Sequence, residues 1–214
     1  MAGTVRVMVV DDQMMARGYL SDHIGASSRY EVVASFGSAE LAVAYCAEHP
    51  VDLAVLDVVL RGGPDGLEAA AAIKRESPST KVVVVTSMPE VSYLERARAA
   101  HVESFWYKEY ADRPLLEVLD ATMAGESVFP DAVPEVRLGD ALSSDFTAQE
   151  LVVLREMTTG ASNAQIADRL YLSVHTVRTH VRHLLEKTGY ATRTQLAVNA
   201  SLAGLVVARD DEGR

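Results

Sequence analysis

The sequence predicts an α/β domain built on a parallel sheet, followed by a small all-α domain. In residues 1–125, short runs rich in Val and Leu recur at the length of buried strands, and stretches with helical patterning separate them. After Asp145 no strand-like run appears, so residues 145–208 are predicted to be helical. Five alternating strands and helices imply a parallel sheet with helices on both faces and right-handed crossovers.

Each element follows from its own run of residues. The predicted strands are Val5–Val10, Tyr30–Phe36, Leu53–Leu56, Lys81–Val85 and Ser104–Tyr107. The predicted helices are Met14–Ile24, Ser38–His49, Gly66–Arg75, Pro89–Ala99 and Arg113–Ala124. Residues 126–144 contain prolines, a glycine and acids without apolar periodicity, so they are interpreted as a linker, and residues 209–214 as a polar tail.

Composition and charge limit the class of protein. The 214 residues carry a formal net charge of −10, and no apolar run approaches the ~18 residues of a membrane span. The excess acid lies in the first two-thirds, so any DNA contact by residues 145–208 requires a local basic face. Cys46 is the only cysteine, so no internal disulfide can form. We expect a packed thiol and a cytoplasmic protein without a signal peptide.

Polar side chains follow four of the predicted strands, namely Asp11, Asp12, Asp57, Thr86 and Lys108. The carboxyl ends of parallel strands meet at one edge of a sheet, so we expect these side chains to converge. Clustered carboxylates repel one another, and Mg²⁺ relieves that repulsion. Asp57 stands alone after its strand, which suits a nucleophile that takes a phosphoryl group. Taken singly, such residues are more often helix caps.

This pattern resembles the receiver domain of two-component response regulators, which has a flavodoxin-like (βα)5 fold. The resemblance covers residues 4 to about 124 and is carried by Val9-Val10-Asp11-Asp12, Leu56-Asp57, Val85-Thr86-Ser87 and Lys108. It implies that Asp57 is the phosphoacceptor and receives its phosphate from a sensor histidine kinase.

The resemblance also implies a metal set around the phosphoacceptor. Asp12 would bind Mg²⁺ directly and Asp11 through water, and Asp57 and Val59 complete the metal set. Val59 also stands where magnesium-dependent phosphohydrolases usually carry a second acid, which argues against that class of enzyme.

Two further roles are implied for the switch. Thr86 and Lys108 would hold the phosphoryl group, and Thr86 and Phe105 would form the switch, with residues 89–124 as the output face. Phe105 is equally well explained as a core aromatic residue.

The sequence departs from the receiver pattern at three positions. Arg61 stands four residues after Asp57, where a proline is usual, and Gly66 comes one residue later than the usual glycine. Glu109 follows the lysine, where Pro or Asp is typical. We expect these changes to affect phosphorylation kinetics more than the presence of the site.

Residues 145–208 predict a helix–turn–helix arrangement. Thr147 and Glu150 form a capping-box pattern that starts one helix, and Ser162 and Ser173 can cap two more. The third helix has an apolar face that we expect to be buried, made of Val174, Val177, Val181, Leu184 and Leu185.

The other face of that helix is basic and fits the major groove of DNA. Arg178 and Arg182 can pair with guanine, and Thr179 can contact a thymine methyl group. The residues expected to bind phosphates are Ser173, Thr176 and Lys187. An ordinary solvated charged face is the alternative interpretation.

This stretch resembles the LuxR-type, or NarL/FixJ-type, DNA-binding domain. The matching residues are Thr147, Glu150, Leu154, Gly160, Ser162-Asn163, Ile166-Ala167, Leu170, Ser173, Thr176-Val177, His180 and Arg193-Thr194. In that family the helix that follows, here about residues 195–205, often forms a dimer contact. Its Leu196, Ala197, Ala200 and Leu205 can serve that contact or close the core.

Together the two resemblances imply a non-enzymatic, cytoplasmic response regulator in which phosphorylation at Asp57 controls DNA binding and transcription, with Mg²⁺ as its cofactor. The implied partners are DNA, a sensor histidine kinase and a second copy of the chain when active, with RNA polymerase as a candidate and no membrane. Two alternatives stay open: a phosphorylation-independent DNA-binding regulator with an atypical receiver, and a magnesium-dependent phosphohydrolase.

Overall fold

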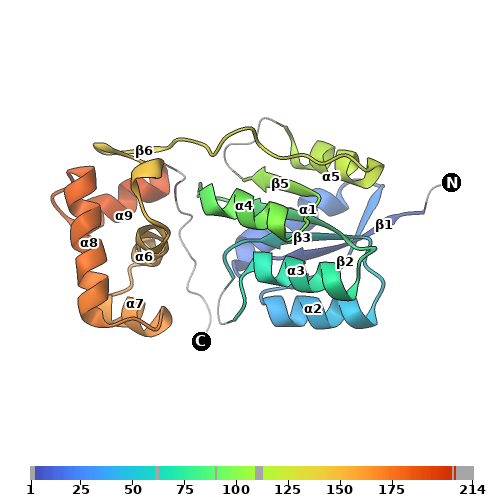
Figure 1. The fold of residues 1–214 in the computed structure, drawn as a ribbon, viewed down its shortest axis with the longest axis horizontal. Coiled ribbons are helices and arrows are strands. Elements are labelled where there is room, and N and C mark those ends of the chain that lie inside the picture. The colour runs from blue at the N-terminus through green and yellow to red at the C-terminus, as the bar shows by residue number, and fades with distance from the viewer. Residues whose placement is uncertain (1–2, 61–62, 90, 109–112, 204, 206–214) are drawn as a thin grey trace. The chain divides into compact units, whose positions relative to one another are not determined.

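The computed structural model describes residues 3–60, 63–89, 91–108, 113–203 and 205. The chain divides into two compact units, residues 1–86 with 92–131 and residues 87–91 with 132–214 (Figure 1). Arg61 and Glu109, two of the three departures from the receiver pattern, and the tail 209–214 lie outside the described residues.

The first unit contains a five-stranded parallel sheet in the order β2-β1-β3-β4-β5. Its strands are β1 (Val5–Val10), β2 (Tyr30–Phe36), β3 (Leu53–Asp57), β4 (Lys81–Thr86) and β5 (Ser104–Tyr107). The five predicted strands are confirmed. Strands β3 and β4 run one residue further than predicted, because Asp57 still pairs with Val85 and Thr86 with Tyr107. The order places β1 directly beside β3, so Asp11, just after β1, and Asp57, at the end of β3, are neighbours.

Five helices accompany the sheet: α1 (Met14–Gly25), α2 (Ala39–Glu48), α3 (Gly66–Glu76), α4 (Val91–Ala99) and α5 (Leu115–Ala124). Helix α5 begins two residues later than predicted because Pro114 is its extended N-cap, with φ −57° and ψ 145°. Helix α4 also begins two residues after its predicted start at Pro89. These shifts leave the predicted alternation of strand and helix intact.

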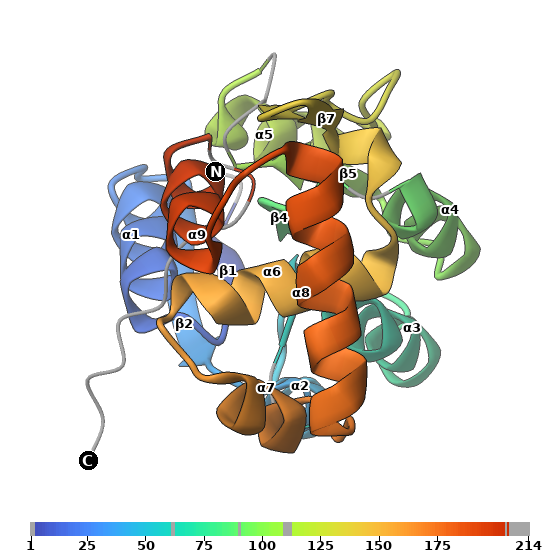
Figure 2. The ribbon, with the colours of Figure 1, turned by 90° about the vertical axis from the view of Figure 1, so that its left-hand side faces the viewer.

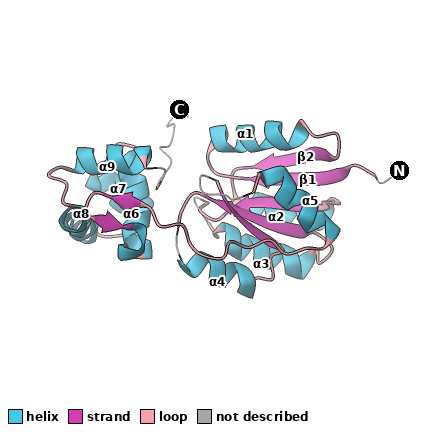
Figure 3. Cartoon of the chain, turned by 90° about the horizontal axis from the view of Figure 1, so that it is seen from above, coloured by secondary structure: helices cyan, strands magenta, loops and turns pink. Residues whose placement is uncertain are grey.

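Alternate side chains of the strands form a core with α1 and α5. Leu20 and Ile24 of α1 and Leu115 and Leu119 of α5 lie in one buried cluster. The strand residues in that cluster are Val7, Val9, Tyr30, Leu53, Val55, Val83 and Val85. Figure 3 shows α3 and α4 together on the opposite side of the sheet. Both faces are therefore covered, as continuous apolar strands require.

Cys46 is buried in α2, and burial raises the pKa of its thiol to about 11. The prediction of a packed, unreactive thiol is confirmed. Among the described residues, no helix is long and apolar enough to cross a membrane.

The second unit is mainly helical, with α6 (Ala148–Thr158), α7 (Asn163–Arg169), α8 (Val174–Thr188) and α9 (Arg193–Leu202) after the 3₁₀ turn η1 (Ser143–Asp145). Figure 2 shows α8 crossing in front of α6, and α8 contacts α6, α7 and α9. Thr147, Ser162 and Ser173 cap α6, α7 and α8, each accepting a bond from the N–H three residues later. The predicted caps are confirmed.

A short antiparallel hairpin lies within the segment interpreted as a linker. Strands β6 (Arg137–Leu138) and β7 (Ala141–Leu142) pair, and Gly139 takes a φ of 62° between them. Leu138 and Ala141 are buried, and the Asp140 N–H donates to the Thr188 carbonyl at 3.1 Å. The hairpin thus secures the end of α8. Strands of two residues leave no periodicity, so the sequence did not predict it.

The expectation that Val174 is buried is wrong, because 37% of its surface is exposed. Val174 is the first residue of α8, and the buried stripe of that helix begins one turn later, at Val177, and continues through Val181 and Leu184 to Thr188. Thr188 fits this apolar stripe because its hydroxyl donates to the Leu184 carbonyl at 2.7 Å. Leu185, also expected to be buried, is partly exposed.

Gly66 begins α3 against the main chain of the predicted phosphoacceptor. Its N–H donates to the Val58 carbonyl at 2.8 Å, and a Cβ at this position would overlap the carbonyl oxygen of Asp57. We therefore expect Gly66→Ala to lower the free energy of unfolding by about 1–3 kcal/mol, measured by urea denaturation. Gly18→Ala is the matched control, since nothing lies within 4 Å of a Cβ there, and a gain of about 0.5–1 kcal/mol is expected. Equal stability of Gly66→Ala and wild type would refute this packing argument.

Candidate metal centre and nucleic-acid interface

Three carboxylates meet at the carboxyl ends of β1 and β3. Asp11, Asp12 and Asp57 each offer one oxygen, and these oxygens lie within 4.8 Å of one another. Asp11 is fully buried and Asp57 is 3% exposed, whereas Asp12 is partly exposed. The structure thus brings together the three acids that the sequence predicts to converge. Three hard oxygen donors at this spacing fit a divalent cation such as Mg²⁺.

Lys108 reaches the acids from the end of β5. Its Nζ donates to Asp11 Oδ2 at 2.6 Å and lies 3.7 Å from Asp57 Oδ2. Asp11 Oδ1 also accepts a bond from the Gln13 N–H at 2.8 Å. Lys108 thus contacts two of the three carboxylates, and carboxylates gathered this closely favour a bound cation.

Thr86 and Val59 complete the predicted set at this edge of the sheet. Thr86 is fully buried at the end of β4, one strand along from Asp57. Val59 is partly exposed, two residues beyond Asp57, and its main-chain carbonyl is the only ligand atom that it can offer a cation. The sheet therefore brings the residues predicted to bind the metal and the phosphoryl group to the carboxyl ends of its strands.

Phe105 lies inside the first unit and is buried. Its ring centroid is 5.1 Å from that of Tyr107 and 6.4 Å from that of Phe129. The guanidinium of Arg98, in α4, lies over Phe129 at 4.7 Å. Rings and guanidinium thus form a continuous stack from β5 through Phe129 to α4.

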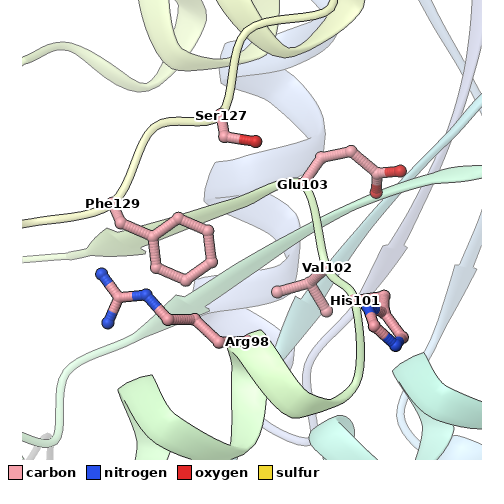
Figure 4. A pocket seen from close by; sticks show the side chains of 6 residues that line it. All are labelled: Arg98, His101, Val102, Glu103, Ser127 and Phe129. Carbon is pink, nitrogen blue, oxygen red and sulfur yellow. The ribbon is translucent and has the colours of Figure 1, made fainter.

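Phe129 and Arg98 also line a surface cavity of about 460 Å³ (Figure 4). Its other lining residues are His101, Val102, Glu103 and Ser127. Residues 101–103 directly precede β5, so this cavity lies at the opposite end of the strand from Lys108. It is separate from the acid cluster.

The outer face of α8 carries the cations predicted to contact DNA. Arg178 and Arg182 are exposed, and Arg182 Nε lies 3.8 Å from Glu186 in an exposed pair. Thr179 is partly exposed, and its hydroxyl donates to the His175 carbonyl at 3.1 Å. Ser173 and Thr176 stand together at the start of the helix, with their hydroxyl oxygens 2.8 Å apart. These five residues share one helix and its cap.

Lys187 is held differently from the other residues predicted to contact DNA. Its Nζ donates to Glu150 Oε2 at 2.7 Å and to the Asp145 carbonyl at 2.8 Å, and it lies 5.9 Å from the ring centre of Phe146. Burial raises the pKa of Glu150, but hydrogen bonds from Lys187 and Thr147 outweigh it, so the net pKa is lowered. Lys187 therefore joins α8 to the start of α6.

Comparisons with known proteins decide the family. A family model described as "Response regulator receiver domain" matches residues 7–120, and one described as "Bacterial regulatory proteins, luxR family" matches residues 144–200. The chain is 32% identical over 208 residues to Response regulator protein VraR of Staphylococcus aureus, covering 95% of this chain and 99% of VraR. The chain belongs to the LuxR-type response regulators. It is a two-component response regulator that controls transcription.

Solved structures share the fold of this response regulator. One is RcsB from Salmonella enterica serovar Typhimurium, bound to a promoter in the presence of the phosphomimetic BeF₃⁻. The structural alignment covers 95% of this chain and 100% of the RcsB chain. Its TM-score is 0.56 at 19% identity, so this likeness shows the fold alone. A LuxR-family regulator from Aurantimonas sp. SI85-9A1 matches 59% of this chain and 89% of its own, with a TM-score of 0.55 and 26% identity.

The last helix, α9, and Leu205 just after it contribute buried apolar side chains to the second unit. Leu196, Ala200 and Leu205 are buried, and Ala197 is partly exposed. Arg193 donates to Asn163 Oδ1 at 3.0 Å and to the Ala161 carbonyl at 2.8 Å, which links α9 to the start of α7. Closing the core accounts for most of these apolar side chains.

Sequence reasoning missed two contacts around the acid site of the response regulator. Arg17 donates to the main-chain carbonyl of Asp11 at 2.6 Å, and Arg96 of α4 donates to Asp65 Oδ2 at 2.5 Å. Asp65 also caps α3 in a capping box with Glu68. The box was visible as an acid three residues before Glu68, but no local signal pairs Asp65 with an arginine 31 residues away.

Removing the Lys187 amine tests how much the ion pair between Lys187 and Glu150 stabilises the fold. We expect Lys187→Met to lower the free energy of unfolding at pH 7 by about 1–3 kcal/mol, because a buried carboxylate loses its cation. The pKa of Glu150 is lowered in the folded state, so this stabilisation is present above its ordinary value of 4.5 and is lost as the pH falls through the folded pKa. Denaturation curves at pH 7 and in the acid range measure the difference, which should shrink in acid.

The exposed pair Arg182–Glu186 provides the control. Arg182→Met should change stability by less than about 0.5 kcal/mol at either pH, because both side chains are about two-thirds exposed. A Lys187→Met protein as stable as wild type at pH 7 would show that Lys187 is available for DNA instead.

Proposed function

We propose that this response regulator is switched by phosphorylation of Asp57, and that the phosphorylated protein binds DNA through the outer face of α8. The observation that supports it is the cluster of Asp11, Asp12 and Asp57 beside Lys108, in a chain that also contains a LuxR-type domain. The phosphate donor is the phosphohistidine of a sensor kinase. An acid cluster of this kind has no evident structural use, because like charges are gathered at little benefit to folding.

The chemistry follows from the position of each group. The Asp57 carboxylate attacks phosphorus, an aspartyl phosphate forms, and the histidine of the kinase leaves. Asp11, Asp12, Asp57 and the Val59 carbonyl would hold Mg²⁺, which supplies positive charge against the phosphoryl oxygens. Lys108 already lies within 3.7 Å of Asp57 and would pair with the added phosphoryl group.

The buried end of β4 provides a path from the site to the rest of the first unit. A phosphoryl oxygen can accept a hydrogen bond from the Thr86 hydroxyl, which would draw Thr86 toward Asp57. β4 pairs with β5, where Phe105 stacks with Phe129 and through it reaches Arg98 of α4. We propose that this movement biases α4 and the chain after α5 between two arrangements.

DNA recognition would use the exposed residues of α8. We propose that Arg178, Arg182 and Thr179 read base edges, and that Ser173 and Thr176 contact phosphates. Lys187 contributes by holding α8 against Glu150. The active species is proposed to be a homodimer, since binding to paired half-sites raises affinity through effective concentration.

Phosphorylation should change DNA affinity through Asp57. The probe is a DNA duplex that the protein selects from a random-sequence library. With beryllofluoride and Mg²⁺, which mimic the phosphoryl group, we expect about a tenfold or greater gain in affinity together with dimer formation. Asp57→Asn should abolish both responses, measured by fluorescence anisotropy and sedimentation. If wild type shows neither the gain in affinity nor dimer formation, the result favours the phosphorylation-independent regulator. Turnover of small phosphoesters would favour the phosphohydrolase.

The arginines of α8 should carry operator binding. Arg178→Ala and Arg182→Ala are each expected to weaken binding to the selected duplex by about 1–3 kcal/mol, because each loses a base contact. Arg137→Ala removes the same charge from the exposed edge of β6 and should have a smaller effect. Wild-type affinity in both α8 variants at physiological salt contradicts the assigned DNA-binding face.

A further inference from the structure

Tyr171 adopts a backbone conformation that large side chains avoid. Its φ is 54°, in the left-handed region, directly after the last turn of α7. Its N–H donates to the Asp168 carbonyl at 3.3 Å, and the Leu172 N–H donates to the Ala167 carbonyl at 2.9 Å. These two bonds are those of a Schellman ending, in which the left-handed position is usually glycine.

Three other helices of the chain end with glycine at the left-handed position, which is the favoured residue there. Gly125, Gly160 and Gly189 occupy the left-handed position after α5, α6 and α8. Among the described residues, the non-glycine residues with positive φ are His101, after α4, and Tyr171. Histidine is several-fold enriched in this region, whereas a bulky tyrosine there is a genuine outlier.

Packing of the Tyr171 side chain does not offset the backbone strain. Its side chain is 94% exposed, so it has almost no packing contact with either neighbouring helix. Glycine would make the same two main-chain hydrogen bonds without the steric penalty of a Cβ. The side chain therefore has its use outside the folded chain.

The position of Tyr171 indicates which partner it meets. It lies two residues before Ser173, the cap of α8, and Val174 and Thr176 nearby also reach the surface. In a helix–turn–helix the N-terminal residues of the second helix contact bases in the major groove, and the first helix crosses the DNA backbone. The turn that joins the two helices is therefore close to that backbone. Tyrosine hydroxyls are among the side-chain groups that donate to phosphates.

We propose that Tyr171 is a DNA contact whose phenol donates a hydrogen bond to a backbone phosphate at the edge of the groove that α8 enters. The proposal rests on the DNA-binding function proposed above and adds a residue outside the basic face. A phosphate contact fixes the register of the protein on the duplex and carries no sequence information. The strained ending of α7 thus serves to project the ring away from the protein.

Two variants separate the side chain from the backbone. Tyr171→Phe removes only the hydroxyl, and Tyr171→Gly removes the ring and relieves the strain. In full-length protein with beryllofluoride and Mg²⁺, we expect both to raise the Kd roughly 5- to 10-fold, on the selected duplex and on a random duplex of equal length. The salt dependence of Kd should stay unchanged, because a neutral phenol releases no counterion.

Stability should move in the opposite direction in the glycine variant. Tyr171→Gly is expected to raise the Tm of the second unit by roughly 4–8 °C while binding weakens, so a folding defect cannot explain the loss. Tyr19→Phe is the matched control: it removes the hydroxyl of another exposed tyrosine, in α1 of the first unit, and should leave the Kd at the wild-type value.

The outcomes separate this proposal from the proposed function. If Arg178→Ala weakens binding while both Tyr171 variants bind as wild type, the DNA contact is refuted and the DNA-binding function stands. If the Tyr171 variants lose affinity for the selected duplex alone, the phosphate contact is also refuted, because that result indicates a base contact. If wild type binds no duplex under these conditions, both proposals fail.

Discussion

The first unit depends on keeping buried negative charges together at one end of its sheet. Asp11 and Asp57 have almost no contact with solvent, although they lie beside a third carboxylate. Isolated carboxylates in such surroundings carry a large desolvation cost, so the fold must supply compensation. Lys108 supplies a cation and the Gln13 N–H a hydrogen bond. Three carboxylates within 4.8 Å of one another also favour a bound cation.

This constraint extends to the surrounding elements. Gly66 lets α3 begin against the main chain of Asp57, and Asp65 ties the start of α3 to Arg96 of α4. The residues that follow β3 are therefore connected to α4, a helix of the proposed output face. The second unit uses a related device, since the buried carboxylate of Glu150 is fixed by Lys187 and holds α8 at its end. In both units a charged pair positions a helix for which we propose a function.

Much of this arrangement could be predicted from the sequence because the signals are local. Apolar runs give the strands, the residue after each run gives the converging site, and Thr147, Ser162 and Ser173 mark helix starts by their own side chains. The features that escaped prediction depend on distant partners or on helix context. The residues paired with Lys187 lie 37 and 42 positions away, and the two-residue strands of the hairpin lack periodicity. Val174 followed the apolar pattern but starts its helix beyond the buried stripe.

The balance of charge at the acid cluster is tested most directly by the Tm of wild type and Asp57→Asn, each measured in EDTA and in Mg²⁺. If the acids repel one another and form a cation site, Asp57→Asn melts at a higher temperature than wild type in EDTA. Mg²⁺ then raises the Tm of wild type by mass action and that of the variant much less. A wild-type Tm that does not respond to Mg²⁺, together with a lower Tm for Asp57→Asn in EDTA, would contradict the account.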